Sequence, residues 1–257
     1  MTIKNEQQYI DEWLDYHLGL GIDKVLLWED IGSVPHDVSK YPQDRVILKH
    51  ISDIENLGKK NRQITAYEES FPILKEMGCT WAAFIDADEF IRLEDGYSLD
   101  RMAEEFSGET GLILYWENIG SDGKTYNEPD IPVQDRFRKR CEYSFTQFRA
   151  FFKVFVNLDR CDELKNIHYA EGAVNPDGSS KIRKQGVFGD KMWLTHYCTK
   201  SWEEWCMKFI VRGDMFPGNR RLSEYFQNNR EERKMKDKMM ELYKEWKICF
   251  GFEQPTT

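Results

Sequence analysis

The chain has 257 residues, of which 40% are hydrophobic and 32% charged, and these values are typical of a soluble globular protein. A formal net charge of −9 argues against a nucleic-acid partner, because phosphate binding needs a basic face. The six cysteines include no CxxC pair, which disfavours a structural zinc site and predicts reduced thiols. No run of about 18 apolar residues occurs, so we expect no transmembrane segment and a cytoplasmic location.

The first half of the chain alternates strand-like and helix-like patterns, which predicts an α/β fold with a mainly parallel sheet flanked by helices. Apolar residues recur at helical spacing over residues 9–18 and 64–77, and Gly21 is placed to end the first of these helices. Pro72 lies inside the second helix, where we expect a kink. The strands expected in this half are residues 1–4, 24–28, 45–50 and 81–85.

The second half is less regular and predicts an α+β part followed by a helical tail. Ser201 and Glu204 have the spacing of a capping box, so a helix is expected to begin there and to end at Gly213. We expect one domain over residues 1–215 and a helical extension over residues 216–257 that packs on it; docking of this tail on a membrane or a partner is the alternative. The extended segments expected here are residues 111–116, 151–156 and 192–195.

The apolar strand at residues 81–85 runs directly into Asp86, Ala87, Asp88 and Glu89. Carboxylates packed at a strand end repel one another and lose hydration unless they are paired or bind a metal. Ligands bind at the carboxyl ends of strands in open α/β sheets, and carboxylate oxygens suit Mg²⁺ or Mn²⁺. The pattern therefore predicts that Asp86 and Asp88 hold a divalent cation against a diphosphate; an ordinary acidic loop is the alternative.

Two further residues are candidates for the same site. His196 follows an apolar stretch and precedes the capped helix, which makes it a candidate metal ligand, although a lone histidine is more often structural. Lys200 lies where the amino end of that helix could contact an anion, with a plain helix cap as the alternative. Basic stretches at residues 59–62, 136–140 and 181–184 could contact phosphate, but solvated surface is the favoured interpretation for most of them.

Several segments together resemble glycosyltransferases of the bacterial family 2-like group, which share the GT-A fold with glycosyltransferase family 92. The resemblance covers about residues 3–213 and is more specific than the Asp-x-Asp pattern alone. The matching residues are Lys4, Asn5, Glu6, 12–14, His17, Gly21, 81–90, 196–201, Glu204, Lys208, Arg212 and Gly213.

The resemblance implies a GT-A-like nucleotide-binding sheet and an acceptor-binding second half. Asp86 and Asp88 would bind the metal, Mn²⁺ or Mg²⁺, and the diphosphate, and His196 would complete the metal shell. The residues implied to line the nucleoside pocket are Asn5, Glu6, Asp30, Arg62 and Gln63.

The implied reaction moves a hexose from a nucleotide-diphosphate sugar, expected to be UDP-linked, to a glycan or lipid-linked glycan in surface polysaccharide synthesis. The enzyme would work at the inner face of the membrane with at most a peripheral contact, and a single displacement would invert the anomeric configuration. Glu117 and Asp122, which follow the strand at 111–116, are candidate bases for the acceptor hydroxyl.

Two alternatives remain for the function. One is a non-catalytic module that binds nucleotide sugars without turnover. The other is a phosphatase with an aspartate nucleophile, although Phe90 stands where such enzymes have threonine or valine.

Overall fold

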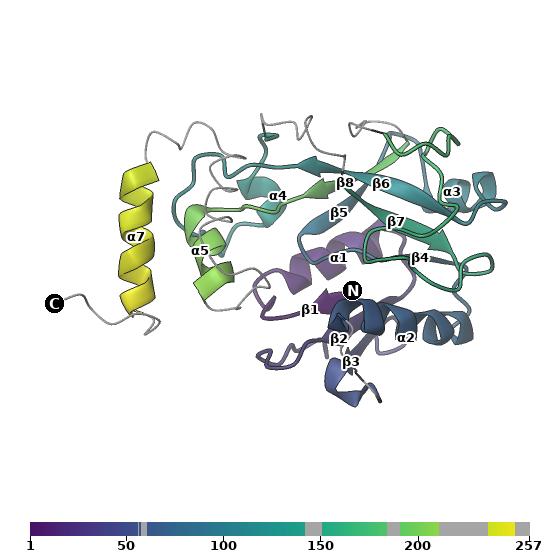
Figure 1. The fold of residues 1–257 in the computed structure, drawn as a ribbon, viewed down its shortest axis with the longest axis horizontal. Coiled ribbons are helices and arrows are strands. Elements are labelled where there is room, and N and C mark those ends of the chain that lie inside the picture. Colours follow the sequence, from purple (N-terminus) through teal and green to yellow (C-terminus); the bar gives the residue numbers. More distant parts are fainter. Residues whose placement is uncertain (56, 58–60, 142–150, 184–190, 211–235, 250–257) are drawn as a thin grey trace. The chain divides into compact units, whose positions relative to one another are not determined.

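The structure is a computed structural model that describes the chain except residues 56, 58–60, 142–150, 184–190, 211–235 and 250–257 (Figure 1). The strands are β1 Thr2–Ile3, β2 Val25–Glu29, β3 Val46–His50, β4 Trp81–Ala83, β5 Glu89–Leu93, β6 Gly111–Asn118, β7 Phe152–Asn157 and β8 Met192–His196. The helices are α1 Ile10–Leu20, α2 Arg62–Glu76, α3 Leu99–Glu105, α4 Val133–Arg136, α5 Trp202–Ile210 and α7 Lys236–Cys249, with a 3₁₀ turn η1 at Ile51–Asp53.

The chain groups into two compact units. The first unit is Met1–Glu117 with Phe145–His196, and the second unit is Asn118–Ser144 with Tyr197–Thr257. The domain boundary expected at residue 215 lies outside the described residues, as does Gly213, so both stay predictions.

The strands form two sheets. β1, β2 and β3 form a parallel three-stranded sheet, in which Thr2 is paired with Trp28 and Val25 with Val46. The larger sheet has the strand order β4-β7-β6-β8-β5, and its β4–β7, β6–β7 and β5–β8 pairs are antiparallel. The protein is therefore a mixed α/β fold whose sheets are partly parallel, and the expectation of a mainly parallel sheet is wrong for the larger one.

The connections between strands explain this difference. Parallel neighbours need a long crossover, usually a helix, whereas antiparallel neighbours do not. Helix α1 supplies such a crossover between β1 and β2, and α2 lies between β3 and β4. Within the described part of the first unit, α3 is the only helix after β5, so β6, β7 and β8 follow without regular crossovers.

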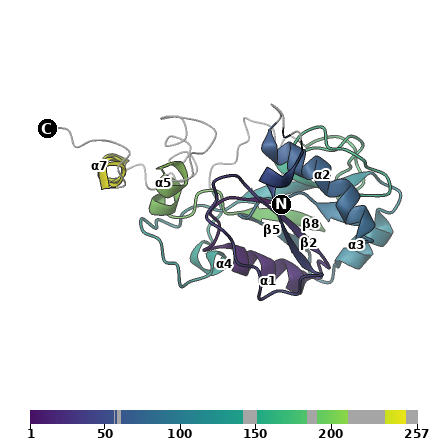
Figure 2. The ribbon, with the colours of Figure 1, turned by 90° about the horizontal axis from the view of Figure 1, so that it is seen from below.

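Helices α1 and α2 lie on opposite sides of strand β2 (Figure 2). Strand β2 is buried along its whole length, as expected for a strand covered on both faces. Helix α1 buries the stripe that contains Trp13, Leu14 and His17, and it ends at Gly21, whose φ of 106° is left-handed. The predicted end of this helix is therefore confirmed.

Aromatic packing fixes helix α2. The Tyr67 and Phe71 rings lie 4.9 and 5.2 Å from the Phe84 ring, and Trp28 Nε1 donates a hydrogen bond of 2.9 Å to Ser70 Oγ. The four aromatic residues belong to one buried cluster that α2 shares with β2, β4, β6 and β7. Helix α2 continues through Pro72, and its first residue, Arg62, is held near the end of β2.

His17 gives the first unit a pH-dependent stability. Its side chain is fully buried, its Nδ1 lies 2.8 Å from the Trp13 carbonyl, and its Nε2 accepts the Ile91 N–H at 3.2 Å. Both contacts are made by the neutral ring with its proton on Nδ1, because Nε2 must keep a lone pair. Burial, only partly offset by the Trp13 carbonyl, lowers the pKa of His17 from 6.5 to about 4.

We therefore expect acid to destabilise the fold through His17. The folded pKa lies below the unfolded value, so this stability is complete above pH 6.5 and is lost as the pH falls towards 4. This difference between the folded and unfolded pKa of His17 corresponds to about 3 kcal/mol of unfolding free energy. Urea unfolding at pH 7.5 and pH 4.5 of wild type and His17→Gln measures it, since glutamine keeps one donor and one acceptor but does not titrate here. An equal loss of stability in both proteins would contradict this assignment.

In the second unit, the predicted capping box is present. Ser201 N–H donates to Glu204 Oε2 at 3.0 Å, and Glu204 N–H donates to Ser201 Oγ at 3.2 Å, so helix α5 begins as expected. Trp202 is fully buried and donates from Nε1 to the Met239 carbonyl of α7 at 2.9 Å. No helix in the described ranges has both the length and the apolar composition needed to cross a bilayer.

Candidate functional site

The acidic motif forms a tight turn between β4 and β5. Strand β4 ends at Ala83, two residues earlier than expected, although the Phe84 N–H still donates to Val154 of β7 at 3.3 Å. The Glu89 N–H donates to the Asp86 carbonyl at 3.0 Å, and the Asp86 N–H donates to Glu89 Oε2 at 2.9 Å. Glu89 thus closes the turn, in which Asp86 is the first residue and Asp88 the third.

The Asp86 carboxylate is held by three side chains. Its Oδ2 lies 2.8 Å from Lys153 Nζ of β7, and its Oδ1 accepts from Gln63 Nε2 at 2.9 Å and from the Tyr67 hydroxyl at 3.5 Å. Burial opposes ionisation of Asp86, but the Lys153 ammonium outweighs burial and lowers the pKa of the carboxyl below its usual value. Asp86 is therefore ionised and already has a counter-ion.

Asp88 lies beside the predicted histidine. Strands β5 and β8 pair so that Glu89 is opposite His196, and this register places His196 Nε2 3.6 Å from Asp88 Oδ1. The Asp88 and His196 side chains are 13% and 11% exposed, so solvent still reaches them. The His196 ring also packs on Trp116 of β6, with the ring centroids 4.2 Å apart. The structure thus brings together three residues that are far apart in sequence.

Glu89 is a different kind of carboxylate from its neighbours. It is fully buried, and its Oε1 has no hydrogen-bond partner among the described residues. Burial outweighs the attraction of Lys153 and raises the pKa of Glu89 well above its usual value. Its two hydrogen bonds with the Asp86 backbone stabilise the turn.

Two of the residues predicted to line the nucleoside pocket form an ion pair with each other. Arg62 Nε lies 3.0 Å from Asp30 Oδ1, and an Arg62 terminal nitrogen donates to Oδ2 at 3.1 Å. Lys4 Nζ lies 3.8 Å from the same Oδ2. Arg62 and Gln63 are the first two residues of α2, so the amino end of this helix meets Asp30 at the end of β2 and Asp86 at the end of β4.

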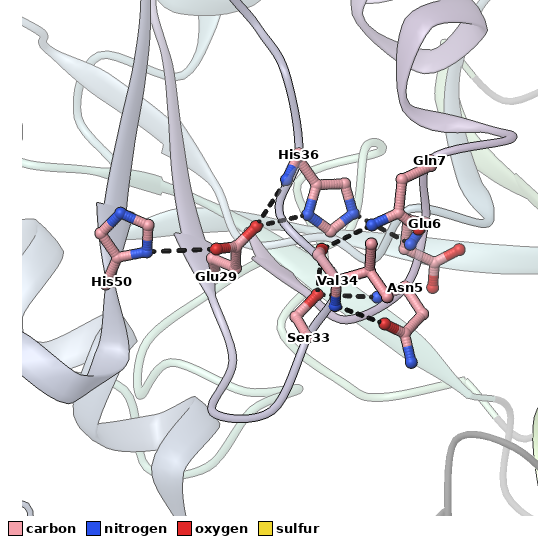
Figure 3. A network of polar contacts seen from close by, with 8 residues as sticks. All are labelled: Asn5, Glu6, Gln7, Glu29, Ser33, Val34, His36 and His50. Carbon is pink, nitrogen blue, oxygen red and sulfur yellow. Dashed lines mark hydrogen bonds and ion pairs between the residues drawn. The ribbon is translucent and has the colours of Figure 1, made fainter.

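Asn5 and Glu6 are anchored to the loop that follows β2 (Figure 3). Asn5 has a left-handed φ of 54°, and its Oδ1 accepts the Val34 N–H at 2.8 Å. The Glu6 N–H donates to His36 Nε2 at 2.9 Å, and His36 Nδ1 lies 2.7 Å from Glu29 Oε1. These contacts shape the loop, and the nucleoside-binding role expected of Asn5 and Glu6 stays a prediction.

The two candidate bases have different environments. Glu117 of β6 is buried, and its Oε2 accepts from Trp193 Nε1 at 3.0 Å and from Thr195 Oγ1 at 3.2 Å. Both donors lie on β8, the strand that ends at His196. Asp122 belongs to the second unit, and its carboxylate accepts the N–H groups of residues 138 and 139 at 2.8 and 2.9 Å. The roles of Glu117 and Asp122 as bases stay predictions.

Lys200 and the basic stretch at 136–140 belong to the second unit. Lys200 is buried and has a left-handed φ of 51°, so it sits in the turn before α5. Arg136 is also buried, whereas solvated surface was the favoured interpretation for this stretch. The charge of Arg136 is tolerated there because its terminal nitrogen lies 3.1 Å from Glu204 Oε1. Residues 59, 60 and 184 of the other basic stretches lie outside the described residues.

Sequence reasoning missed Lys153. It is the second residue of the apolar strand β7, and its side chain has no exposed surface. Asp86 and Glu89 raise the pKa of Lys153 although burial opposes this, so the ammonium stays charged. A single lysine inside an apolar strand is a signal in the sequence, since lysine is almost never fully buried without a partner.

The donor set fits a divalent cation with few protein ligands. Two ligand atoms at about 2.1 Å from one ion can be 3.6 Å apart, which is the Asp88–His196 separation. Across the described residues, no three His, Cys, Asp or Glu side chains are grouped to hold an ion by themselves. A cation here would therefore depend on Asp88 and His196 with substrate oxygens, as Mg²⁺ sites often do.

One cavity of the first unit lies away from this site. It has a volume of about 550 Å³ and lies between β2 and β4. None of the predicted site residues lines it. Met1 does, and its amine donates to the Leu26 carbonyl at 2.9 Å. We therefore locate the candidate site at the turn between β4 and β5 and not in the cavity.

The fold and the site together define a class: a mixed α/β protein with polar groups gathered at the ends of its strands. The family model for glycosyltransferase family 92 matches residues 1–248, and the chain therefore belongs to glycosyltransferase family 92. The protein is a glycosyltransferase, which acts on a sugar donor and an acceptor. No curated protein matches the chain. The family 92 part of the resemblance is confirmed, and the bacterial family 2-like grouping stays a prediction.

Proposed function

We propose that this glycosyltransferase moves a hexose from a UDP-linked sugar to a glycan acceptor with the help of Mn²⁺ or Mg²⁺. The observation that carries the proposal is the meeting of Asp88 and His196 beside Asp86 at the turn between β4 and β5. A GT-A fold, an inverting outcome and a role in surface polysaccharide synthesis at the cytoplasmic face of the membrane are part of the same proposal.

Each group around the turn has a chemical task in this reaction. A cation on Asp88 and His196 would stabilise charge on the departing nucleoside diphosphate. The amino end of α2, with Arg62, provides positive potential next to the phosphates, and Asp30 provides acceptor oxygens for the nucleoside. Glu117 would accept the proton of the acceptor hydroxyl, and attack at the anomeric carbon in one step would invert its configuration.

Donor binding is expected to need both the nucleotide sugar and the cation. At a ligand concentration of 100 times the Kd, binding stabilises the folded state by about 2.7 kcal/mol, which a thermal-shift assay detects. The wild-type protein should shift with a UDP-hexose and Mn²⁺ together, and EDTA should remove most of the shift. The same samples, given candidate acceptors, report release of UDP.

The outcomes separate the alternatives. A cation-dependent shift with acceptor-dependent UDP release supports the proposal. A shift without release under any acceptor would instead favour a non-catalytic binding module. Release of inorganic phosphate without sugar transfer would favour the phosphatase. Identical unfolding temperatures with every nucleotide sugar, with or without Mn²⁺, would contradict the proposed donor class.

A further inference from the structure

Asp86, the first aspartate of the motif, is occupied by the protein itself. Lys153 Nζ lies 2.8 Å from its Oδ2, and Gln63 Nε2 lies 2.9 Å from its Oδ1. Asp88 faces His196 Nε2 at 3.6 Å, a separation that two ligand atoms of one ion can have. The two aspartates of the motif therefore differ in their partners: the Asp86 carboxylate, although 34% exposed, is paired with a buried ammonium, whereas Asp88, 13% exposed, faces a histidine.

Burial keeps the Lys153 ammonium away from solvent. The side chain is completely buried in β7, and the neighbouring strand residues Val154 and Phe155 are buried as well. An ammonium that turned away from Asp86 would lose its ionised partner inside the protein, which is strongly unfavourable. A divalent ion bound to Asp86 Oδ2 would lie close to this fixed charge and be repelled by it.

We propose that Lys153 is a resident counter-ion that competes with the divalent cation for Asp86. Lys153 confines the cation to Asp88 and His196 and keeps the affinity of the site for free metal low. The phosphates of the donor complete the shell, so cation and donor bind together. This inference rests on the proposed function, of which it describes the regulation.

The competition is tested by metal binding in the absence of any nucleotide. Electron paramagnetic resonance of free Mn²⁺ gives the affinity of the wild type and of Lys153→Met directly. We expect Lys153→Met to bind Mn²⁺ about tenfold more tightly, because the variant lacks the ammonium that repels the ion and leaves the Asp86 carboxylate available as a ligand. Lys153→Arg keeps the charge and should retain the wild-type affinity. Lys75→Met, which removes an exposed pair with Asp162, is the matched control.

A second variant keeps the test decisive if Lys153→Met does not fold. In the wild type without donor, Asp86 is not a metal ligand, so the double variant Asp86→Asn/Lys153→Met, which leaves neither charge of the pair unpaired, should change Mn²⁺ affinity by no more than about twofold, whereas Asp88→Asn should weaken it by about tenfold or more. Weakening by the double variant to the same extent as by Asp88→Asn would overturn the proposal, as would unchanged affinity in a folded Lys153→Met. These titrations use no nucleotide sugar, so they are independent of whether the proposed donor is correct.

Discussion

Asp88→Asn is expected to reduce sugar transfer at least about 100-fold, or roughly 3 kcal/mol of transition-state stabilisation. The substitution keeps the shape of the side chain but removes the charge that faces His196 Nε2 at 3.6 Å. Because Asp88 is partly exposed and lies in the turn between β4 and β5, the fold should tolerate the change. The measurement is UDP release at saturating donor and Mn²⁺, compared with wild type.

Two controls show whether this loss is specific. Asp95→Asn changes an exposed aspartate in the loop before α3 and should leave turnover unchanged. Thermal unfolding of the metal-free Asp88→Asn protein should match that of the wild type, which excludes a folding defect. Turnover within about threefold of wild type would show that Asp88 does not support the chemistry.

Arg136→Met is expected to destabilise the second unit by about 3–5 kcal/mol, because it leaves a buried charge unpaired. Arg136 lies 3.1 Å from Glu204 Oε1 and donates to Asn127 Oδ1 at 2.7 Å, and the Arg136 and Glu204 side chains are only 1% and 5% exposed. Glu204 also closes the capping box of α5, so its charge cannot move away. Urea unfolding followed by tryptophan fluorescence measures the loss.

A double variant separates the unpaired charge from lost packing. Arg136→Met combined with Glu204→Gln removes both charges and keeps a glutamine that suits a capping box, so it should recover part of the stability. Arg138→Met breaks an exposed pair with Asp135 and should cost no more than about 1 kcal/mol. A loss below about 1 kcal/mol for Arg136→Met would show that the buried pair contributes little.

Local patterns predicted the elements that depend on neighbouring residues. The helix that ends at Gly21, the buried strand β2 and the capping box of α5 all follow from spacing, glycine conformation and side-chain caps. The direction in which strands pair does not depend on neighbouring residues alone. The second half carried no signal that β5 would pair antiparallel with β8, about a hundred residues later.

The candidate site divides in the same way. The motif at Asp86 and Asp88 and the candidate His196 are visible in the sequence, because carboxylates after an apolar strand and a histidine at a strand end are unusual. Their proximity depends on the β5–β8 register, which no short segment encodes. The partner of Asp86 was missed because Lys153 reaches it only across the β4–β7 pair.

The sequence by itself determined the kinds of elements, the acidic turn and membership of a glycosyltransferase family, since these depend on residue types at fixed spacing. Only the tertiary structure decided which charges meet. Burial and ion pairing depend on what surrounds a side chain in space, so Asp86 received a lysine, Asp88 a histidine and Glu89 neither. Three carboxyl groups within four residues thereby acquired three different environments, because each has different neighbours in space.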